Sequence, residues 1–163
     1  MNLVPEIDVK QTRDNARRVL KSCRTLQRRS GIVVSLESPL LSNMPRYRSN
    51  RNNVEHSMIK WLGNVNKFYI NENKKFREIL QAIDTALKSL SEVSRKILYY
   101  SYCVADPYSM AKLSTIIKVY RENEFGQVEE ITYSIKNIEK LKNNALIEFA
   151  EAYHYENLIV QKK

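Results

Sequence analysis

Apolar residues recur at helical intervals near the start of the chain, the spacing that places side chains on one face of a helix. This stripe comprises Val9, Ala16, Val19, Cys23 and Leu26. Gly31 follows the stripe, and glycine is common immediately beyond a helix end. The pattern predicts one helix from Asp8 to about Arg29.

Helical periodicity resumes over residues 54–90, in two stripes that share steps of three and four residues. The stripes comprise Val54, Met58, Trp61, Val65 and Phe68, and then Phe76, Leu80, Ile83, Leu87 and Leu90. They are out of register across residues 70–73, so we expect a tight turn or a helix kink there. A turn would give an antiparallel helical pair, whereas one long helix could dimerise. Each stripe is too short to establish a coiled coil.

Two shorter helices are expected after residue 90. Ser91 is suited to cap the first, because its hydroxyl can accept a hydrogen bond from a free amide in the first turn. The apolar face of that helix comprises Val93, Ile97, Tyr100 and Val104. Asp106-Pro107 is expected to open the second helix, since proline is tolerated in a first turn. This second helix should run through Ile117.

The last helix is expected from about Ser134 to Tyr153, with Thr132 or Ser134 as its cap. Its inner face comprises Ile138, Leu141, Ala145, Phe149 and Ala152. A polar face near its N-terminus comprises Lys136, Asn137, Lys140, Asn143 and Asn144. Asparagine can make a paired contact with adenine, and lysine can reach guanine or a phosphate. The face therefore indicates a recognition helix for double-stranded DNA, although an ordinary solvated face would look similar.

Turn-forming residues are rare outside one segment. The 163 residues include three glycines and four prolines, which favours helices over a many-stranded β fold. Residues 31–53 contain two of the prolines and a long polar run, and are expected to form a linker. The sequence thus predicts an all-α chain with a basic helix in 1–30, a linker in 31–53, a helical pair or long helix in 54–90, and a helix-turn-helix region in 91–163.

Positive charge is concentrated at the start of the chain. The net charge is +9, and residues 1–53 hold 11 Lys or Arg against 4 Asp or Glu. Four arginines line one side of the first predicted helix, namely Arg13, Arg17, Arg24 and Arg28. Guanidinium groups suit phosphate oxygens, so we expect this side to contact a DNA backbone. A solvated face without a ligand is the alternative, and a membrane-surface helix is disfavoured because the apolar stripe lacks aromatic residues.

The chain lacks the residue groupings that catalysis or metal binding requires. His56 and His154 have no nucleophile, paired carboxylate or phosphate-binding loop beside them. Cys23 and Cys103 lack zinc or redox spacing and are expected to be two buried thiols. We therefore expect no enzymatic activity, no metal and no cofactor.

Membrane and secretory signals are not evident in the sequence. No apolar run approaches the roughly 20 residues of a membrane-spanning helix. The first residues lack the charged-then-apolar pattern of a secretory signal. We expect no membrane partner and a location in the cytoplasm of a bacterial host cell.

Several stretches resemble one known family. They are residues 3–8, 15–21, 90–92, 95–98, 133–134 and, most specifically, 141–153. In these stretches the chain resembles the ArpU group of phage transcriptional regulators, which is common in Gram-positive bacteria and their prophages. The resemblance reaches both ends of the chain.

The resemblance implies a C-terminal region like the promoter-reading C-terminal region of sigma factors. Residues 91–104 would be a supporting helix and 107–117 the first helix of a helix-turn-helix. Tyr133-Ser134 would begin the recognition helix, in which Lys136, Asn137 and Lys140 would read bases and phosphates. Members of the group are associated with switching on phage late genes for packaging and lysis.

The sequence therefore indicates a sequence-specific DNA-binding regulator, an activator of phage or prophage late genes. Two alternatives stay open. One is a protein-interaction module that modulates host RNA polymerase without reading bases, and the other is a DNA-binding phage packaging subunit. Host RNA polymerase and a second copy of the chain are further candidate partners.

One segment departs from the family pattern. Residues 114–131 stand where the family has a short turn, and they include the acidic pair Glu129-Glu130. Either the preceding helix lengthens before a loop, or residues 116–120 pair with 128–131 as a hairpin. We favour the longer helix. The acidic pair would repel phosphate, so the insertion is expected to point away from DNA and could contact RNA polymerase or another protein.

Overall fold

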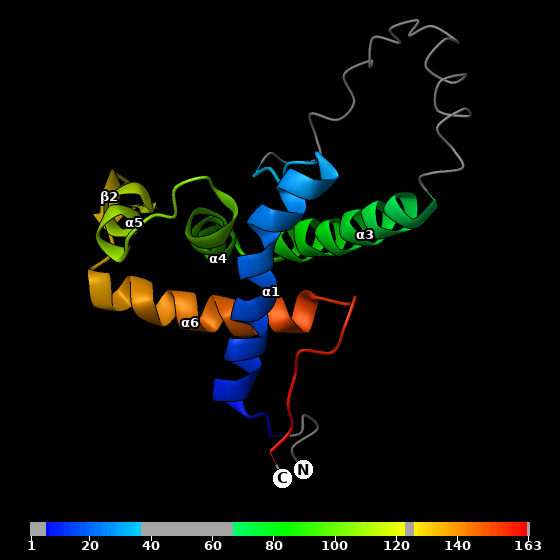
Figure 1. The fold of residues 1–163 in the computed structure, drawn as a ribbon. Coiled ribbons are helices and arrows are strands. Elements are labelled where there is room, and N and C mark those ends of the chain that lie inside the picture. Colours follow the sequence, from blue (N-terminus) through cyan, green and yellow to red (C-terminus); the bar gives the residue numbers. More distant parts are fainter. Residues whose placement is uncertain (1–5, 37–66, 123–125, 163) are drawn as a thin grey trace, which may run out of the picture.

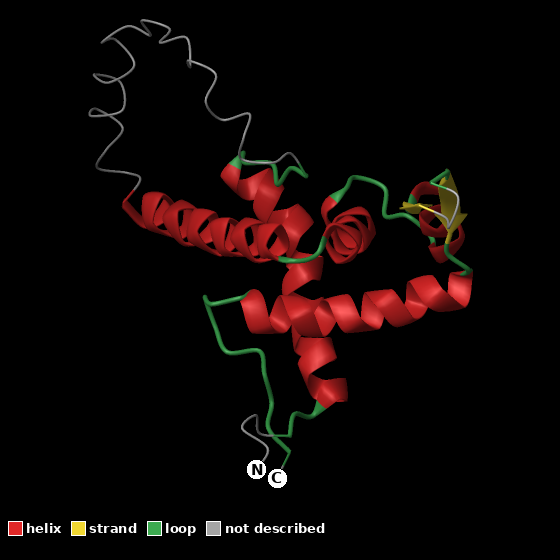
Figure 2. Cartoon of the chain, turned by 180° about the vertical axis from the view of Figure 1, so that it is seen from behind, coloured by secondary structure: helices red, strands yellow, loops and turns green. Residues whose placement is uncertain are grey.

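The computed structural model describes residues 6–36, 67–122 and 126–162 of the chain. It is mostly helical, with one small two-stranded sheet (Figures 1 and 2). In chain order the elements are α1 (Val9–Ser30), α3 (Lys67–Ser89), α4 (Glu92–Leu98), the π-helix η3 (Tyr99–Cys103), α5 (Met110–Ile116), β1 (Lys118–Glu122), β2 (Val128–Thr132) and α6 (Ile135–Ala152).

Helix α1 confirms the first predicted helix almost residue for residue. Asp8 caps its start, because a carboxylate oxygen accepts a hydrogen bond from the Gln11 amide at 3.0 Å. Gly31 ends it in the left-handed region at φ 68°, and its amide donates to the Gln27 carbonyl at 2.9 Å. A residue without a Cβ adopts this conformation at little cost.

Helix α3 runs without interruption through residues 70–73, so the tight turn, one of the two alternatives expected there, is wrong. Those residues include neither proline nor glycine, and a shift in the apolar stripe does not by itself break the backbone ladder. Leu80, Ile83 and Leu87 are buried, as their stripe predicts. The earlier stripe from Val54 to Val65 lies outside the described residues.

Helix α4 begins where the sequence predicts, since the Ser91 hydroxyl accepts a hydrogen bond from the Ser94 amide at 3.3 Å. Its last turn widens into η3. The next helix, α5, does not open at Asp106-Pro107: it begins at Met110 with Ser109 as its cap. The Tyr108 amide donates to a carbonyl of η3 at 2.9 Å, which holds the preceding residues outside the helix.

The all-α prediction is wrong at the insertion. Helix α5 ends at Ile116, and β1 and β2 then form an antiparallel hairpin in place of the longer helix that we favoured. Val119 pairs with Ile131 near the start of the hairpin, and Glu122 pairs with Val128 at its end. Gly126 in the connection has φ 73°, which a glycine adopts without strain.

Helix α6 joins two clusters of buried side chains. Ala145, Leu146 and Phe149 pack in the larger cluster with α1, α3 and η3. Nearer its start, Ile138 packs in a smaller cluster with residues of α4 and α5. Figures 1 and 2 show α1 lying across α6 and α3, with α4, α5 and the hairpin gathered above the N-terminal half of α6. The position of α6 is thus fixed along its whole length.

The two ends of the described chain lie side by side (Figure 1). Ile7 and Gln161 form an isolated antiparallel bridge. The Thr12 hydroxyl accepts a hydrogen bond from the Val160 amide at 3.1 Å, and Leu158 is buried. These contacts anchor the segment after α6 along the first turns of α1.

Candidate nucleic-acid interface

The N-terminal half of α6 is the first candidate surface. The Ser134 hydroxyl caps the helix by accepting a hydrogen bond from the Asn137 amide at 3.3 Å, which confirms one of the two predicted caps. Ile138 is fully buried and sets which side of the helix faces the core. Helical geometry then turns the opposite side outward.

The five residues of the predicted recognition face lie on this outward side. With about 3.6 residues per turn, they fall within about 120° of the helix circumference. Lys136, Asn137, Lys140 and Asn144 are exposed, whereas Asn143 is half-buried. Among the described residues, no hydrogen bond or ion pair engages the side chains of Lys136, Lys140 or Asn144. These polar groups are available to an external ligand.

Sequence reasoning missed two further exposed residues near the start of α6. Ile135, in the first turn, is 52% exposed although it is apolar. Glu139 is exposed beside the predicted face. Ile135 lies seven residues before Lys142 and therefore on the same side of α6 as Lys142, not on the polar face.

The arginine stripe of α1 is the second candidate surface, and it is only partly free. Arg28 is exposed, whereas Arg13, Arg17 and Arg24 are half-buried. Arg17 forms an ion pair with Asp14 at 2.6 Å between Nη1 and Oδ1. The Nε of Arg13 is buried and has no hydrogen-bond partner among the described residues. The protein's own contacts therefore engage part of the stripe that the sequence assigned to phosphate.

The outward side of α1 carries additional cations. A shallow hollow of about 370 Å³ is lined by Asp14, Arg17, Arg18 and Lys21. Arg18 lies 4.0 Å from a carboxylate oxygen of Glu156. The hollow borders three cations and one carboxylate, so its field is positive and suits a phosphate group.

The arginine stripe of α1 meets α6 near Lys142. The Lys142 Nζ lies 4.8 Å from the ring centroid of Tyr102 in η3. Burial, and after it the nearby charge of Arg17, lowers the pKa of Lys142. Burial raises the pKa of Tyr102, and a hydrogen bond from Arg17 opposes that rise.

This meeting point is not on the recognition face. Lys142 lies about 160° around the helix from Lys140, on the side of α6 that faces the core. Arg17 of the arginine stripe therefore adjoins the inner side of α6 and not its polar face. The sequence alone did not place Lys142 at this junction, because Arg17 and Tyr102 are far from it along the chain.

Metal-binding and membrane-spanning features are not found in the described part of the chain. Its residues include no group of three His, Cys, Asp or Glu side chains placed to hold a metal ion. Within the same residues, no helix is both long and apolar enough to cross a membrane. Cys23 and Cys103 are buried thiols, as predicted, with their sulfur atoms 3.1 Å apart.

Comparison with known proteins finds a relative that matches along the whole chain. The chain is 37% identical over 163 residues to an Enterococcus hirae protein named "Putative autolysin regulatory protein ArpU". The alignment covers 99% of this chain and 100% of that protein. No protein-family model matches the chain, and no solved structure matches it.

Proposed function

The chain belongs to the family of the autolysin regulatory protein ArpU, and from this membership we propose that it is a sequence-specific, DNA-binding transcriptional regulator. The observation that carries the proposal is the outward Lys/Asn face on the capped N-terminal half of α6. We propose further that it activates late genes of a phage or prophage and does not act as an enzyme.

The chemistry of this face fits the major groove, which admits one α-helix. Asn137 and Asn144 offer an amide donor and acceptor in a fixed geometry, as adenine recognition requires. Lys136 and Lys140 can donate to guanine or to phosphate. Because Ile138 anchors the inner side of the same turns, the face would approach DNA as a rigid unit.

The basic side of α1 is proposed to supply contacts to phosphate. Arg28 is exposed at the end of this helix, and Arg18 and Lys21 line its positive hollow. Such contacts position a protein on a duplex and strengthen binding to all sequences alike. In this division of roles, α6 supplies specificity and α1 supplies affinity.

The test is a fluorescence-anisotropy titration with the duplex upstream of the late genes beside this chain's own gene, and with a shuffled duplex. We expect a preference for the native duplex of about 10³ or more. Replacing Lys136, Asn137 and Lys140 together with alanine should reduce binding to the level of the shuffled duplex.

A matched control is available in α3, where Asn73, Lys74 and Lys75 are also exposed. Their triple alanine variant loses the same residue types and the same charge, and it should keep the preference. Retention of the preference by the α6 variant, or no binding of the wild type to either duplex, would contradict the proposal.

A further inference from the structure

The β1–β2 hairpin has an unusual amount of exposed apolar surface. Five of the eight large apolar residues that are exposed in the described chain lie in it or directly beside it, namely Ile116, Tyr120, Val128, Ile131 and Ile135. Tyr120 is 66% exposed and Val128 is 68% exposed. Of the ten strand residues, Val119 alone is not exposed. A gathering of apolar side chains at one end of a molecule marks a contact surface.

The hairpin is also incomplete as a sheet. A two-stranded hairpin is marginally stable in water, whereas three or more strands are stable more readily. In the described chain β1 pairs with β2 and with no other strand, so one edge of β1 has no strand beside it. The free N–H and C=O groups of such an edge favour addition of another strand.

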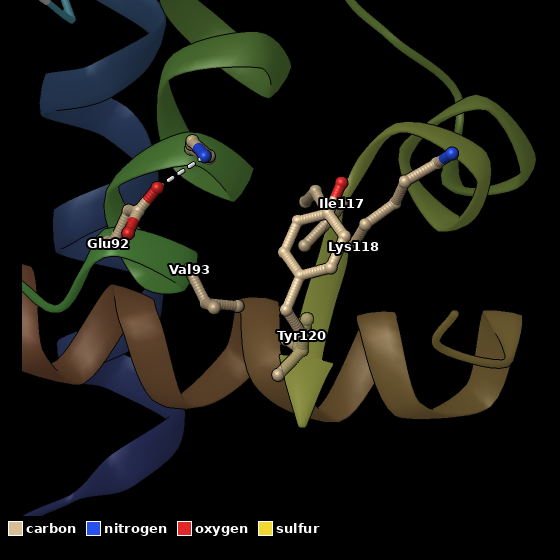
Figure 3. A pocket seen from close by; sticks show the side chains of 7 residues that line it. Glu92, Val93, Ile117, Lys118 and Tyr120 are labelled. Atoms are coloured by element: carbon tan, nitrogen blue, oxygen red, sulfur yellow. Dashed lines mark hydrogen bonds and ion pairs between the residues drawn. The ribbon is translucent and has the colours of Figure 1, made fainter. Parts of the chain in front are cut away.

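A hollow next to β1 provides room for an added segment. It has a volume of about 350 Å³ and lies between the start of α4 and β1. Figure 3 shows Val93 of α4 on one side of it and Tyr120 of β1 on the other. Glu92 and Lys96 form an ion pair at its rim. The hollow is thus partly apolar and, besides this ion pair, is lined by Lys118.

The order of the charged residues along β1 indicates which segment pairs with its free edge. We propose that β1 pairs antiparallel with β1 of a second copy of this chain, about a two-fold axis through Tyr120. In this register Lys118 lies opposite Glu122 of the second copy, and Glu122 lies opposite its Lys118. Opposite charges directly across an antiparallel pair are stabilising, as is a pair of aromatic rings such as the two Tyr120 side chains.

The other edges of the hairpin fit less well. A two-fold pairing of β2 with itself places Glu130 opposite Glu130, which is destabilising. Pairing of β1 with β2 of a second copy leaves further edges open and leads to filaments instead of a closed dimer. Pairing through β1 yields a four-stranded sheet, closed by symmetry, with Lys118 still able to contact Glu130 of its own hairpin.

The test uses two single charge reversals, Lys118→Glu and Glu122→Lys, followed by sedimentation velocity without DNA. Each variant alone places like charges opposite each other twice, so its self-association should be at least about tenfold weaker than that of the wild type. A mixture of the two variants restores both opposite-charge pairs. We therefore expect the mixture to form a heterodimer, which also shows that both hairpins are folded.

Lys75→Glu is the matched control, since it makes the same charge change at an exposed position of α3, which lies on the other side of α1 from the hairpin (Figure 1). This variant should dimerise like the wild type. A wild type that stays monomeric at all concentrations, single variants that dimerise normally, or a mixture that stays monomeric would each overturn the proposal. Since DNA is not present, none of these outcomes depends on the function proposed for α6.

Discussion

Tyr153 shows how a single buried side chain sets the response of the fold to pH. Its ring stacks on Phe149 with centroids 5.4 Å apart, and the residue is 3% exposed. Burial, and after it the charge of Glu156, raises the pKa of Tyr153 from 10.0 to about 12. The folded state therefore resists ionisation of this phenol at pH values where the unfolded chain loses the proton.

This difference predicts the sign of the pH dependence. The contribution of Tyr153 to the free energy of unfolding is complete below pH 10 and is lost as the pH rises towards about 12. Urea titrations on both sides of pH 10 should show a smaller loss of stability in Tyr153→Phe than in the wild type. Tyr155→Phe, which changes an exposed ring, is the control. Equal losses in wild type and Tyr153→Phe would refute the assignment.

At the scale of elements, the start of α6 is a point where one side chain stabilises several residues of the candidate site. The Ser134 hydroxyl accepts from the Asn137 amide at 3.3 Å. Ser134→Ala should lower the free energy of unfolding by about 1 kcal/mol, whereas Ser134→Asn, another good cap, should cost much less. Chemical denaturation measures both. If alanine and asparagine gave the same loss, packing and not capping would be the cause.

Helices with a cap and a long apolar stripe were predictable from sequence, because both signals are local. This holds for α1, with Asp8 and Gly31 at its ends, and for α6, with Ser134 at its start. The hairpin was not predictable in the same way. Its strands are exposed on both faces, so they lack the alternation of apolar and polar residues that marks a half-buried strand.

The candidate site likewise has one part that was predictable from the sequence and one part that was not. The Lys/Asn face of α6 was predictable, since it follows from the buried residues of the same helix by helical geometry. The partial burial of the arginine stripe was not, because it depends on tertiary contacts. Arg17 contacts Tyr102 of η3, which is 85 residues away along the chain. No pattern within α1 contains that information.

At the scale of the whole molecule, α6 connects the candidate surfaces. It packs with α4 and α5 near its start and with α1 and α3 farther along. Arg17 of α1 lies near Lys142 on its inner side, and the polar face is left on its outer side. This arrangement separates the two contributions to DNA binding that we propose, so mutations can address them one at a time.

Arg24→Ala combined with Arg28→Ala tests the contribution of α1. Phosphate contacts carry little sequence information, so the double variant should bind the native and the shuffled duplex more weakly by the same factor. The slope of log affinity against log salt concentration should fall by about 1 for each phosphate-binding arginine that is replaced. Anisotropy titrations at several salt concentrations measure both quantities.

The decisive comparison is with variants that change charge elsewhere. Lys74→Ala combined with Lys75→Ala removes two positive charges from an exposed part of α3. If this control flattened the salt dependence as much as the α1 variant, net charge and not the arginine stripe would account for the effect. If the α1 variant lost the preference for the native duplex, α1 would contact bases, and the division of roles between α1 and α6 would be wrong. A uniform loss confined to the α1 variant is the outcome that a phosphate-binding helix beside a separate recognition helix requires.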